Sequence, residues 1–343
     1  MDLPIEPGYP PMEARTAERL PEGQGWQYEP KWDGFRCLAF RDGAEVDLRS
    51  KSGQPLARYF PDVVERVRGL GPRRFVLDGE LVIASEGQLD FEELQLRLHP
   101  AASRVAKLAA EKPASYILFD LLVERGRSLV QLTLAERRPR LEQFMRSLKD
   151  DRLHLSPATR SVEEARIWCD EVGQALDGLI AKRLDQPYRS GDRDGAIKWK
   201  RLKTADCVVG GFRYGTNSDL VGSLLLGLYD EEGLLHHVGY TSTIAAKDKP
   251  ALTRRLEGLR KAPGFTGRAP GGPSRWSTER SGEWEPLAHK LVVEVRYDHV
   301  SGGRFRHGTA LLRWRPDKAP EQCRMEQIEP SESTGVEMLL RGE

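Results

Sequence analysis

Lys31 lies in a short run that combines a potential nucleophile with charged neighbours, Glu29–Arg36 (EPKWDGFR). Asp-Gly between two strand-like runs is a turn signal, and Gly34 is free to adopt a positive φ in such a turn. The turn would hold Lys31 at the mouth of a sheet. A lysine amine acts as a nucleophile where nearby cations or partial burial lower its pKa. Considered alone, a lysine beside a hairpin turn is more often a solvated surface residue.

Two carboxylates lie in or beside apolar, strand-like runs further along the chain. Glu80 lies within Val76–Val82 (VLDGELV), and Asp177 lies within Leu176–Lys182 (LDGLIAK). A buried carboxylate is costly unless it is paired or bound to a metal. Carboxylate oxygens suit a hard divalent cation, and both Mg²⁺ and Mn²⁺ meet that description. The two residues therefore predict a metal site, with structural salt bridges as the alternative.

Two lysines and one aromatic residue complete the set of candidate site residues. Lys198 and Lys200 alternate along Ile197–Lys200 (IKWK), so both face the same side of a strand. Two ammonium groups there would neutralise a phosphate; lysines protecting an exposed strand edge are the alternative. Phe119 lies in the apolar run Ile117–Leu122 and would stack on a purine, although an isolated aromatic in a strand is more often part of a core.

The first two hundred residues alternate between strand-like and helical patterns that would position these side chains. Runs rich in apolar, β-branched or aromatic residues predict strands at Phe35–Phe40, Phe75–Ala84, Tyr116–Val123 and Leu179–Lys182. Helical patterns lie between them at Pro61–Leu70, Ala101–Glu111, Ala135–Leu148 and Val162–Leu176. Two of these helices begin with capping boxes, Thr133-x-x-Glu136 and Ser161-x-x-Glu164.

After Lys203 the pattern changes to short strands. Five are predicted, at Ala205–Tyr214, Ser223–Tyr229, Leu234–Thr241, Lys290–His299 and Thr309–Arg315, with one helix at about Lys247–Lys261. Five strands with one inserted helix suggest a small barrel, of which the OB-fold is the commonest. The boundary lies near Arg201–Thr204, so we predict domains at 1–202 and 203–343, the second with an acidic tail.

Charge and cysteine usage exclude several classes of protein. Lys and Arg number 53 and Asp and Glu 52, so a disordered polyelectrolyte is excluded. Residues 203–318 hold 18 Lys/Arg against 13 Asp/Glu, and an excess of this sign suits a phosphate backbone as well as an ordinary solvated face. No run is apolar enough for a membrane span or a secretory leader. Four scattered cysteines indicate neither zinc nor disulfides, so we expect a cytoplasmic protein and, by default, a monomer.

The order of these motifs resembles the motif series of the covalent nucleotidyltransferases, which include ATP-dependent DNA ligases, RNA ligases and mRNA capping enzymes. The matching segments are K-x-D-G-x-R (Lys31–Arg36), S-K-S-G (Ser50–Gly53), D-G-E (Asp78–Glu80), F-D-L-L (Phe119–Leu122), D-G-L-I-A-K (Asp177–Lys182), K-W-K (Lys198–Lys200) and R-x-D-K (Arg315–Lys318). The resemblance implies an α+β adenylation (nucleotidyltransferase) domain with antiparallel sheets and flanking helices, followed by a C-terminal OB-fold β-barrel. Within the superfamily the chain is most similar to short stand-alone bacterial DNA ligases of the ligase C type, on Thr204–Arg213 and Arg304–Lys318.

The resemblance also assigns roles. ATP would transfer AMP to Lys31, and the AMP would pass to the 5′-phosphate of nicked double-stranded DNA before the 3′-hydroxyl closes the backbone. The nucleotide would be held by Glu29, Arg36, Lys51, Glu80, Phe119, Lys198 and Lys200, with Glu80 and Asp177 as metal ligands. Lys198 and Lys200 would also help to keep Lys31 unprotonated. Arg315 and Lys318 would orient the leaving pyrophosphate, and Arg213, Arg304, Arg306 and Arg313 are the candidate DNA contacts.

Two departures from the ligase pattern keep alternatives open. Asp177 stands where DNA ligases usually have Glu, and K-W-K is familiar from capping enzymes. Lys51 stands where ligases usually have Arg, and Arg49 is a second candidate for that role. The alternatives are an RNA-end modifier, either a GTP-using capping enzyme or an RNA ligase, and a non-catalytic nucleic-acid-binding protein. The ligase interpretation implies a role in DNA repair, alongside small primase-polymerases.

Overall fold

The chain forms two compact units. The computed structural model describes residues 1–85, 88–148, 150–172, 176–271, 283–329, 336 and 339–340. Contacts between Cα atoms assign Met1–Arg201 together with Pro330–Glu343 to one unit and Leu202–Glu329 to the other. We had expected residues 319–343 to belong to the second domain as its tail. Instead, the side chains of Val336 and Leu339 are buried in a core of the first unit.

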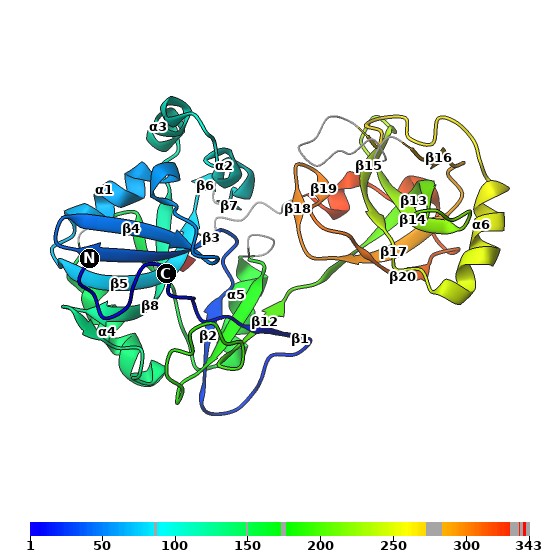
Figure 1. Cartoon of the computed structure of the whole chain (residues 1–343). Helices are drawn as coiled ribbons and strands as arrows, with labels where there is room; N and C mark the ends of the chain where they lie inside the picture. The colour runs from blue at the N-terminus through cyan, green and yellow to red at the C-terminus, as the bar shows by residue number, and fades with distance from the viewer. Residues whose placement is uncertain are drawn as a thin grey trace. The chain divides into compact units, whose positions relative to one another are not determined.

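Two sheets form the centre of the first unit (Figure 1). The larger has the order β10-β8-β5-β3-β4, with β9 beside β8, and its strands are β3 (Phe35–Asp42), β4 (Glu45–Ser50), β5 (Arg74–Val82), β8 (Ser115–Glu124), β9 (Arg127–Ser128) and β10 (Leu153–Leu155). The smaller has the order β1-β12-β11-β2, and its strands are β1 (Arg15–Ala17), β2 (Trp26–Pro30), β11 (Gly178–Arg183) and β12 (Ala196–Lys200). A separate short pair consists of β6 (Ala84–Ser85) and β7 (Gln88–Leu89).

The two sheets pack against each other, and helices cover their outer faces. Leu38, Phe40 and Val76 of the larger sheet share a core with Ile180 and Ala196 of the smaller. On its other face the larger sheet packs against α1 (Pro61–Gly69) and α4 (Leu134–Arg146), and the smaller packs against α5 (Val162–Glu171). The remaining helices are α2 (Phe91–Leu96) and α3 (Ala102–Glu111). Because side chains alternate along a strand, charged residues in step with the shared core point between the sheets.

All the strands and helices predicted for this unit are present. The largest difference is at α5, which ends at Glu171 rather than at Leu176. The capping box of α4 forms as expected, with Thr133 and Glu136 bonded to each other. Only half of the second box forms, because Ser161 accepts the Glu164 N–H while the Glu164 carboxylate accepts the Thr159 hydroxyl instead.

The predicted hairpin at Asp33-Gly34 is wrong. β2 pairs with β11 in the smaller sheet and β3 pairs with β4 and β5 in the larger, so Lys31–Gly34 crosses from one sheet to the other. Gly34 does not lie in the left-handed region; a Cβ atom at this position would lie 2.2 Å from the carbonyl oxygen of Leu81. Glycine is needed here because the segment that crosses between the sheets passes directly against the backbone of β5.

The second unit is an antiparallel sheet that curls into an OB-fold barrel. Its order is β15-β14-β13-β17-β20, and its main elements are β13 (Lys203–Tyr214), β14 (Val221–Tyr229), β15 (Leu235–Thr241), α6 (Lys249–Glu257), β17 (Val292–Tyr297) and β20 (Ala310–Trp314). A parallel bridge between Thr241 and Thr309 brings the ends of the sheet together. The short strands are β16 (Glu285–Pro286), β18 (Val300–Ser301) and β19 (Arg304–Phe305). The five predicted strands and the inserted helix are therefore confirmed.

Candidate active site

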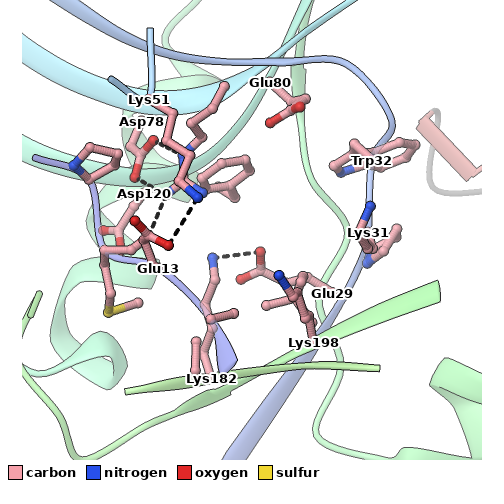
Figure 2. Close-up of a pocket in the computed structure, with 18 of the residues that line it drawn as sticks. Glu13, Glu29, Lys31, Trp32, Lys51, Asp78, Glu80, Asp120, Lys182 and Lys198 are labelled. Carbon is pink, nitrogen blue, oxygen red and sulfur yellow. Dashed lines mark hydrogen bonds and ion pairs between the residues drawn. The ribbon is translucent and has the colours of Figure 1, made fainter. Parts of the chain in front are cut away.

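A cavity of about 300 Å³ lies between the two sheets of the first unit (Figure 2). Its walls come from both sheets, from the segment that crosses between them and from the chain near Met12. Seven of the predicted site residues line it: Glu29, Lys31, Arg36, Lys51, Glu80, Phe119 and Lys198. Asp177 and Lys200 are not among the lining residues, and Arg315 and Lys318 belong to the second unit.

Lys31 is held by an ion pair with Asp177. Its Nζ lies 2.7 Å from Oδ2 of Asp177, which precedes β11, and the backbone N–H of Lys31 donates to the carbonyl oxygen of Gly178. Burial acts to lower the pKa of Lys31, but the Asp177 carboxylate, assisted by Asp33 and Glu80, outweighs burial and raises it. The resting amine is therefore protonated. We had expected Lys198 and Lys200 to keep it neutral, and this is wrong for the free protein.

Glu80 is the carboxylate most affected by its surroundings. Burial raises its pKa to about 7, against the opposing effects of Arg36 and Lys31. Among the residues that the structure describes, Glu80 makes no hydrogen bond or ion pair with a side chain. A half-neutral, uncommitted carboxylate close to a nucleophile is suited to receive a cation, and oxygen donors are what Mg²⁺ and Mn²⁺ prefer. Glu80 and Asp177 both offer the carboxylate oxygens that such a cation takes.

Lys198 faces the cavity from an inner strand. β12 lies between β1 and β11, so the alternative of lysines protecting a sheet edge does not apply. Burial, followed by the charges of Lys51, Lys31 and Lys200, lowers the pKa of Lys198. Cations gathered in this way are each destabilised by the others, and an anion in the cavity would relieve that repulsion.

Phe119 forms an aromatic wall of the cavity, and two cations lie close to its ring. The guanidinium carbon of Arg36 and the Nζ of Lys182 each lie 4.5 Å from the centre of the Phe119 ring. Lys182 is buried and donates to Oε2 of Glu29 at 2.7 Å, while Gln27 donates to Oε1 at 2.8 Å. Sequence reasoning missed Lys182 and Gln27, although Lys182 is in step with Ile180 on the inward face of β11.

Arg36 is fixed by the buried carboxylate of Asp78. Its Nε and Nη2 donate to the two carboxylate oxygens of Asp78 at 2.5 and 2.6 Å, and the Tyr188 hydroxyl donates to the same carboxylate at 2.6 Å. Burial and the Asp78 charge raise the pKa of Tyr188 well above its usual value, so the phenol stays neutral. The D-G-E motif thus supplies two carboxylates, and Asp78, which we had not singled out, fixes the guanidinium.

At the mouth of the cavity, Lys51 rather than Arg49 is in place. Lys51 follows β4 and its Nζ lies 2.9 Å from Oε2 of Glu13, which also accepts from Arg193 at 3.1 Å. Bonding to Lys51 lowers the pKa of Glu13. Arg49 instead pairs with Asp47 and does not line the cavity. Glu13 was missed because nothing in its local sequence marks it.

In the second unit, the two cations of the R-x-D-K motif share one carboxylate. Arg315 Nη1 lies 2.9 Å and Lys318 Nζ 2.7 Å from oxygens of Asp206 on β13, and Arg315 also pairs with Asp317. That second pair lowers the pKa of Asp317 to about 2. Both cations are thus held side by side on the barrel by a residue that the motif does not include.

The four arginines proposed to contact DNA differ in their surroundings. Arg304 is half-buried and its Nη2 lies 3.0 Å from Nδ1 of His237, whereas Arg313 forms an ion pair with Glu294. Burial, then Arg268 and Arg213, lowers the pKa of Arg304, and burial lowers that of Arg213. Arg304, Arg268 and Arg213 therefore form a crowded cationic group, while Arg313 is already neutralised.

Comparison with known proteins follows the same two-part division. Residues 11–203 match the ATP dependent DNA ligase domain, and residues 217–318 match the ATP dependent DNA ligase C terminal region. The chain belongs to the ATP-dependent DNA ligase family. Similar relatives include DNA ligase C2 of Mycolicibacterium smegmatis, 42% identical over 98% of this chain and 99% of that protein, and DNA ligase C of Mycobacterium tuberculosis, 41% identical over 100% and 99%.

A solved structure agrees with this ligase assignment. The ligase domain of M. tuberculosis LigD is 28% identical, covers 92% of this chain and 97% of that one, and has a TM-score of 0.52. These matches confirm the expected DNA ligase over the RNA-end modifier and the non-catalytic protein. Asp177 and the K-W-K strand are thus variations within a DNA ligase. In the described part of the chain, no helix is long and apolar enough to span a membrane.

Proposed function

We propose that the cavity between the two sheets is the site of lysine adenylation and that Lys31 is its nucleophile. The observation that carries this is the place of Lys31 in a cavity that Phe119, Lys198 and Lys51 also line. A purine against Phe119 would direct its phosphates toward those cations. Phosphoryl transfer depends mainly on such positioning and charge neutralisation.

The reaction has three steps, and in each step one bond forms as another breaks. The Lys31 amine, having lost its proton, forms an N–P bond to the α-phosphorus of ATP, and the bond from that phosphorus to pyrophosphate breaks. The AMP then passes to the 5′-phosphate of a DNA nick, which frees the lysine. Finally the 3′-hydroxyl attacks that 5′-phosphorus, the backbone closes and AMP leaves.

Asp177 controls the first step because it holds the proton on Lys31. The ion pair of 2.7 Å keeps the free enzyme inert toward electrophiles until the carboxylate is engaged elsewhere. Glu80 and Asp177 would hold a divalent metal, and a metal bound there supplies positive charge to the phosphate oxygens. Lys198, on β12 of the smaller sheet, and Lys51, after β4 of the larger one, would neutralise the same phosphates, with Lys51 released from Glu13.

Glu29 and its neighbours would recognise the adenine. Gln27 and Lys182 fix both oxygens of the Glu29 carboxylate, so this edge of the cavity presents a rigid set of polar groups. Arg36, held by Asp78, would contact the ribose. Lys200 lies two residues beyond Lys198 on the same strand face and adds positive charge without lining the cavity.

The barrel would act on the pyrophosphate and on DNA. Arg315 and Lys318 would orient the leaving pyrophosphate after exchanging Asp206 for phosphate oxygens. Nicked double-stranded DNA would be held mainly by its phosphates, with Arg213, Arg304, Arg306 and Arg313 as contacts. An Arg304→Ala enzyme should bind nicked duplex with a salt dependence about one charge shallower. An unchanged slope in a fluorescence titration from low to high salt would remove Arg304 from the contacts.

We further propose a monomeric cytoplasmic repair enzyme. One relative is the multifunctional non-homologous end joining protein LigD of Pseudomonas aeruginosa, 30% identical over 89% of this chain and 35% of that protein, which supports a repair role. A small primase-polymerase that fills gaps would supply the nicks that this ligase closes. The four cysteines are free thiols, as a reducing compartment would keep them.

Intact-protein mass spectrometry tests the proposal directly. After incubation with ATP and Mg²⁺, the unaltered chain should gain the mass of one AMP and the Lys31→Ala chain should gain nothing. Incubation with GTP should leave both masses unchanged. Pyrophosphate treatment beforehand removes any AMP already bound. An adduct that persists in Lys31→Ala would place the nucleophile elsewhere, and a GMP adduct would return the RNA-capping alternative.

A further inference from the structure

The wall that carries Phe119 contains residues from the opposite end of the chain. Trp32 and Phe119, which both line the cavity, share an apolar cluster with Val82, Ile117, Val172 and Leu176, and the same cluster includes Val336 and Leu339. Figure 2 shows a short piece of faint red ribbon, the colour of the C-terminal end, beside Trp32. The cavity wall is therefore completed from behind by the last residues of the ligase.

The side chains of Val336 and Leu339 are buried in this cluster and do not merely lie on its surface. Val336 is 0% exposed and Leu339 is 8% exposed. Leu340 packs at the edge of the same cluster. In contrast, the sequence just before them is Pro330–Gly335 (PSESTG), which offers no apolar side chain larger than proline.

Trp32 links this cluster to the nucleophile. It follows Lys31 directly in the chain and is 6% exposed. Its Nε1 donates to the Ser156 hydroxyl at 3.0 Å, and the rest of the ring depends on apolar neighbours that include the C-terminal residues. Loss of those neighbours would leave a gap behind Trp32 and Phe119, and side chains around such a gap relax into it.

We propose that Val336 and Leu339 act as a strap that positions Trp32 and Phe119, so that ATP binding in the first unit depends on residues encoded after the second. Val336 and Leu339 are the positioning residues. The inference rests on the proposed adenylation site. It also means that the barrel, Leu202–Glu329, is joined to the first unit at both of its ends.

The test compares variants of the enzyme with the unaltered chain. The variants are Val336→Asp, Leu339→Asp and a chain ending at Glu329, with Val336→Ala and Leu339→Ala as milder changes. Val336→Ile and Leu339→Met keep the apolar contact, and Val67→Ala removes a buried group of similar size from α1, in a different core of the same unit. For each, the KM for ATP and the kcat of lysine adenylation are measured, together with sealing of a pre-adenylated nick.

We expect the aspartate variants and the shortened chain to raise the KM for ATP about tenfold, with smaller changes in kcat and in sealing of the pre-adenylated nick. The conservative variants and Val67→Ala should keep the KM of the unaltered enzyme. An unchanged KM in a folded shortened chain, or in the alanine variants if that chain does not fold, would overturn the strap. An equal rise in Val67→Ala would do the same, because the effect would then be general loss of stability. Failure of the unaltered chain to form a lysine adduct would instead overturn the adenylation site itself.

Discussion

A single ion pair determines the protonation state of Lys31, the proposed nucleophile. Lys31 is buried enough that its ammonium form should be disfavoured, yet Asp177 at 2.7 Å raises its pKa. A carboxylate at this distance outweighs the neighbouring ammonium of Lys198, whose own pKa is lowered. The free protein therefore holds this amine in its protonated form, and in the proposed reaction the proton must leave before the amine attacks ATP.

Replacing the carboxylate should reverse this balance. In Asp177→Asn, only the weaker effects of Asp33 and Glu80 oppose burial and the nearby lysines, so the pKa of Lys31 should fall. The neutral, reactive fraction then appears at lower pH. The measurement is modification of Lys31 by an amine-reactive aryl fluoride across pH, followed by peptide mass, without ATP or metal.

The same pH series has a matched control. Asp185→Asn removes an exposed carboxylate of the same unit that pairs with Arg183, at 2.7 Å, and should leave the midpoint for Lys31 where it was. If Asp177→Asn and the unaltered protein share one midpoint, Asp177 does not hold the proton.

At the scale of elements, the site depends on a crossing between two sheets. Lys31 directly follows β2 of the smaller sheet, and three residues later Gly34 lies against β5 of the larger one. The crossing brings Lys31 from one sheet toward Glu80 of the other. A second close approach occurs at Gly178, where φ is +142° and a Cβ atom would lie 2.1 Å from the carbonyl oxygen of Trp199.

Adding one methyl group at the crossing should separate the sheets. Gly34→Ala would force the new Cβ into the backbone of Leu81, and overpacking of this kind costs about 1–3 kcal/mol of unfolding free energy. Urea unfolding measures the loss, and the adduct assay should show slower adenylation. Gly69→Ala is the control, because nothing lies within 4 Å of its Cβ position. Equal losses in both variants would mean that the close approach is not what requires glycine.

At the scale of the whole molecule, the predicted site residues are divided between two units. The first holds Lys31, Glu80 and the Phe119 wall, whereas the second holds Arg315 and Lys318 on Asp206. Such a division suits a reaction in which only one step releases pyrophosphate. Conformational steps that bring such groups to a reaction are common in enzymes.

Loss of either cation should therefore be selective. We expect Arg315→Ala and Lys318→Ala to slow lysine adenylation by about 100-fold while sealing of a pre-adenylated nick changes by less than about threefold. The measurements are the rate of adduct formation and a gel assay of the pre-adenylated nick. Lys290→Ala removes an exposed lysine of the same unit and should leave both rates unchanged. Equal losses in the two assays would contradict this division of labour.

Much of the architecture was open to prediction from local patterns. Apolar periodicity and capping residues, which act over a few positions, predict the motif-bearing strands between β3 and β20. The same local signals predict the helices α1, α3, α4, α5 and α6. The seven predicted site residues among those that line the cavity were identified because their motifs occur in a fixed order. The structure was needed to choose Lys51 over Arg49 as the residue that lines the cavity, because the choice depends on where β4 ends.

What the sequence determined by itself is the set of chemical groups and the elements that hold them, since these depend on neighbours within a few residues. Only the tertiary structure decided the charge state of Lys31, because its partner Asp177 lies 146 positions away. The same holds for the Asp206 carboxylate beneath Arg315, for Glu13 at the mouth and for the burial of Val336 and Leu339 behind Trp32. Each of these is a long-range contact, and no local pattern specifies which distant side chain fills a buried position or neutralises a buried charge.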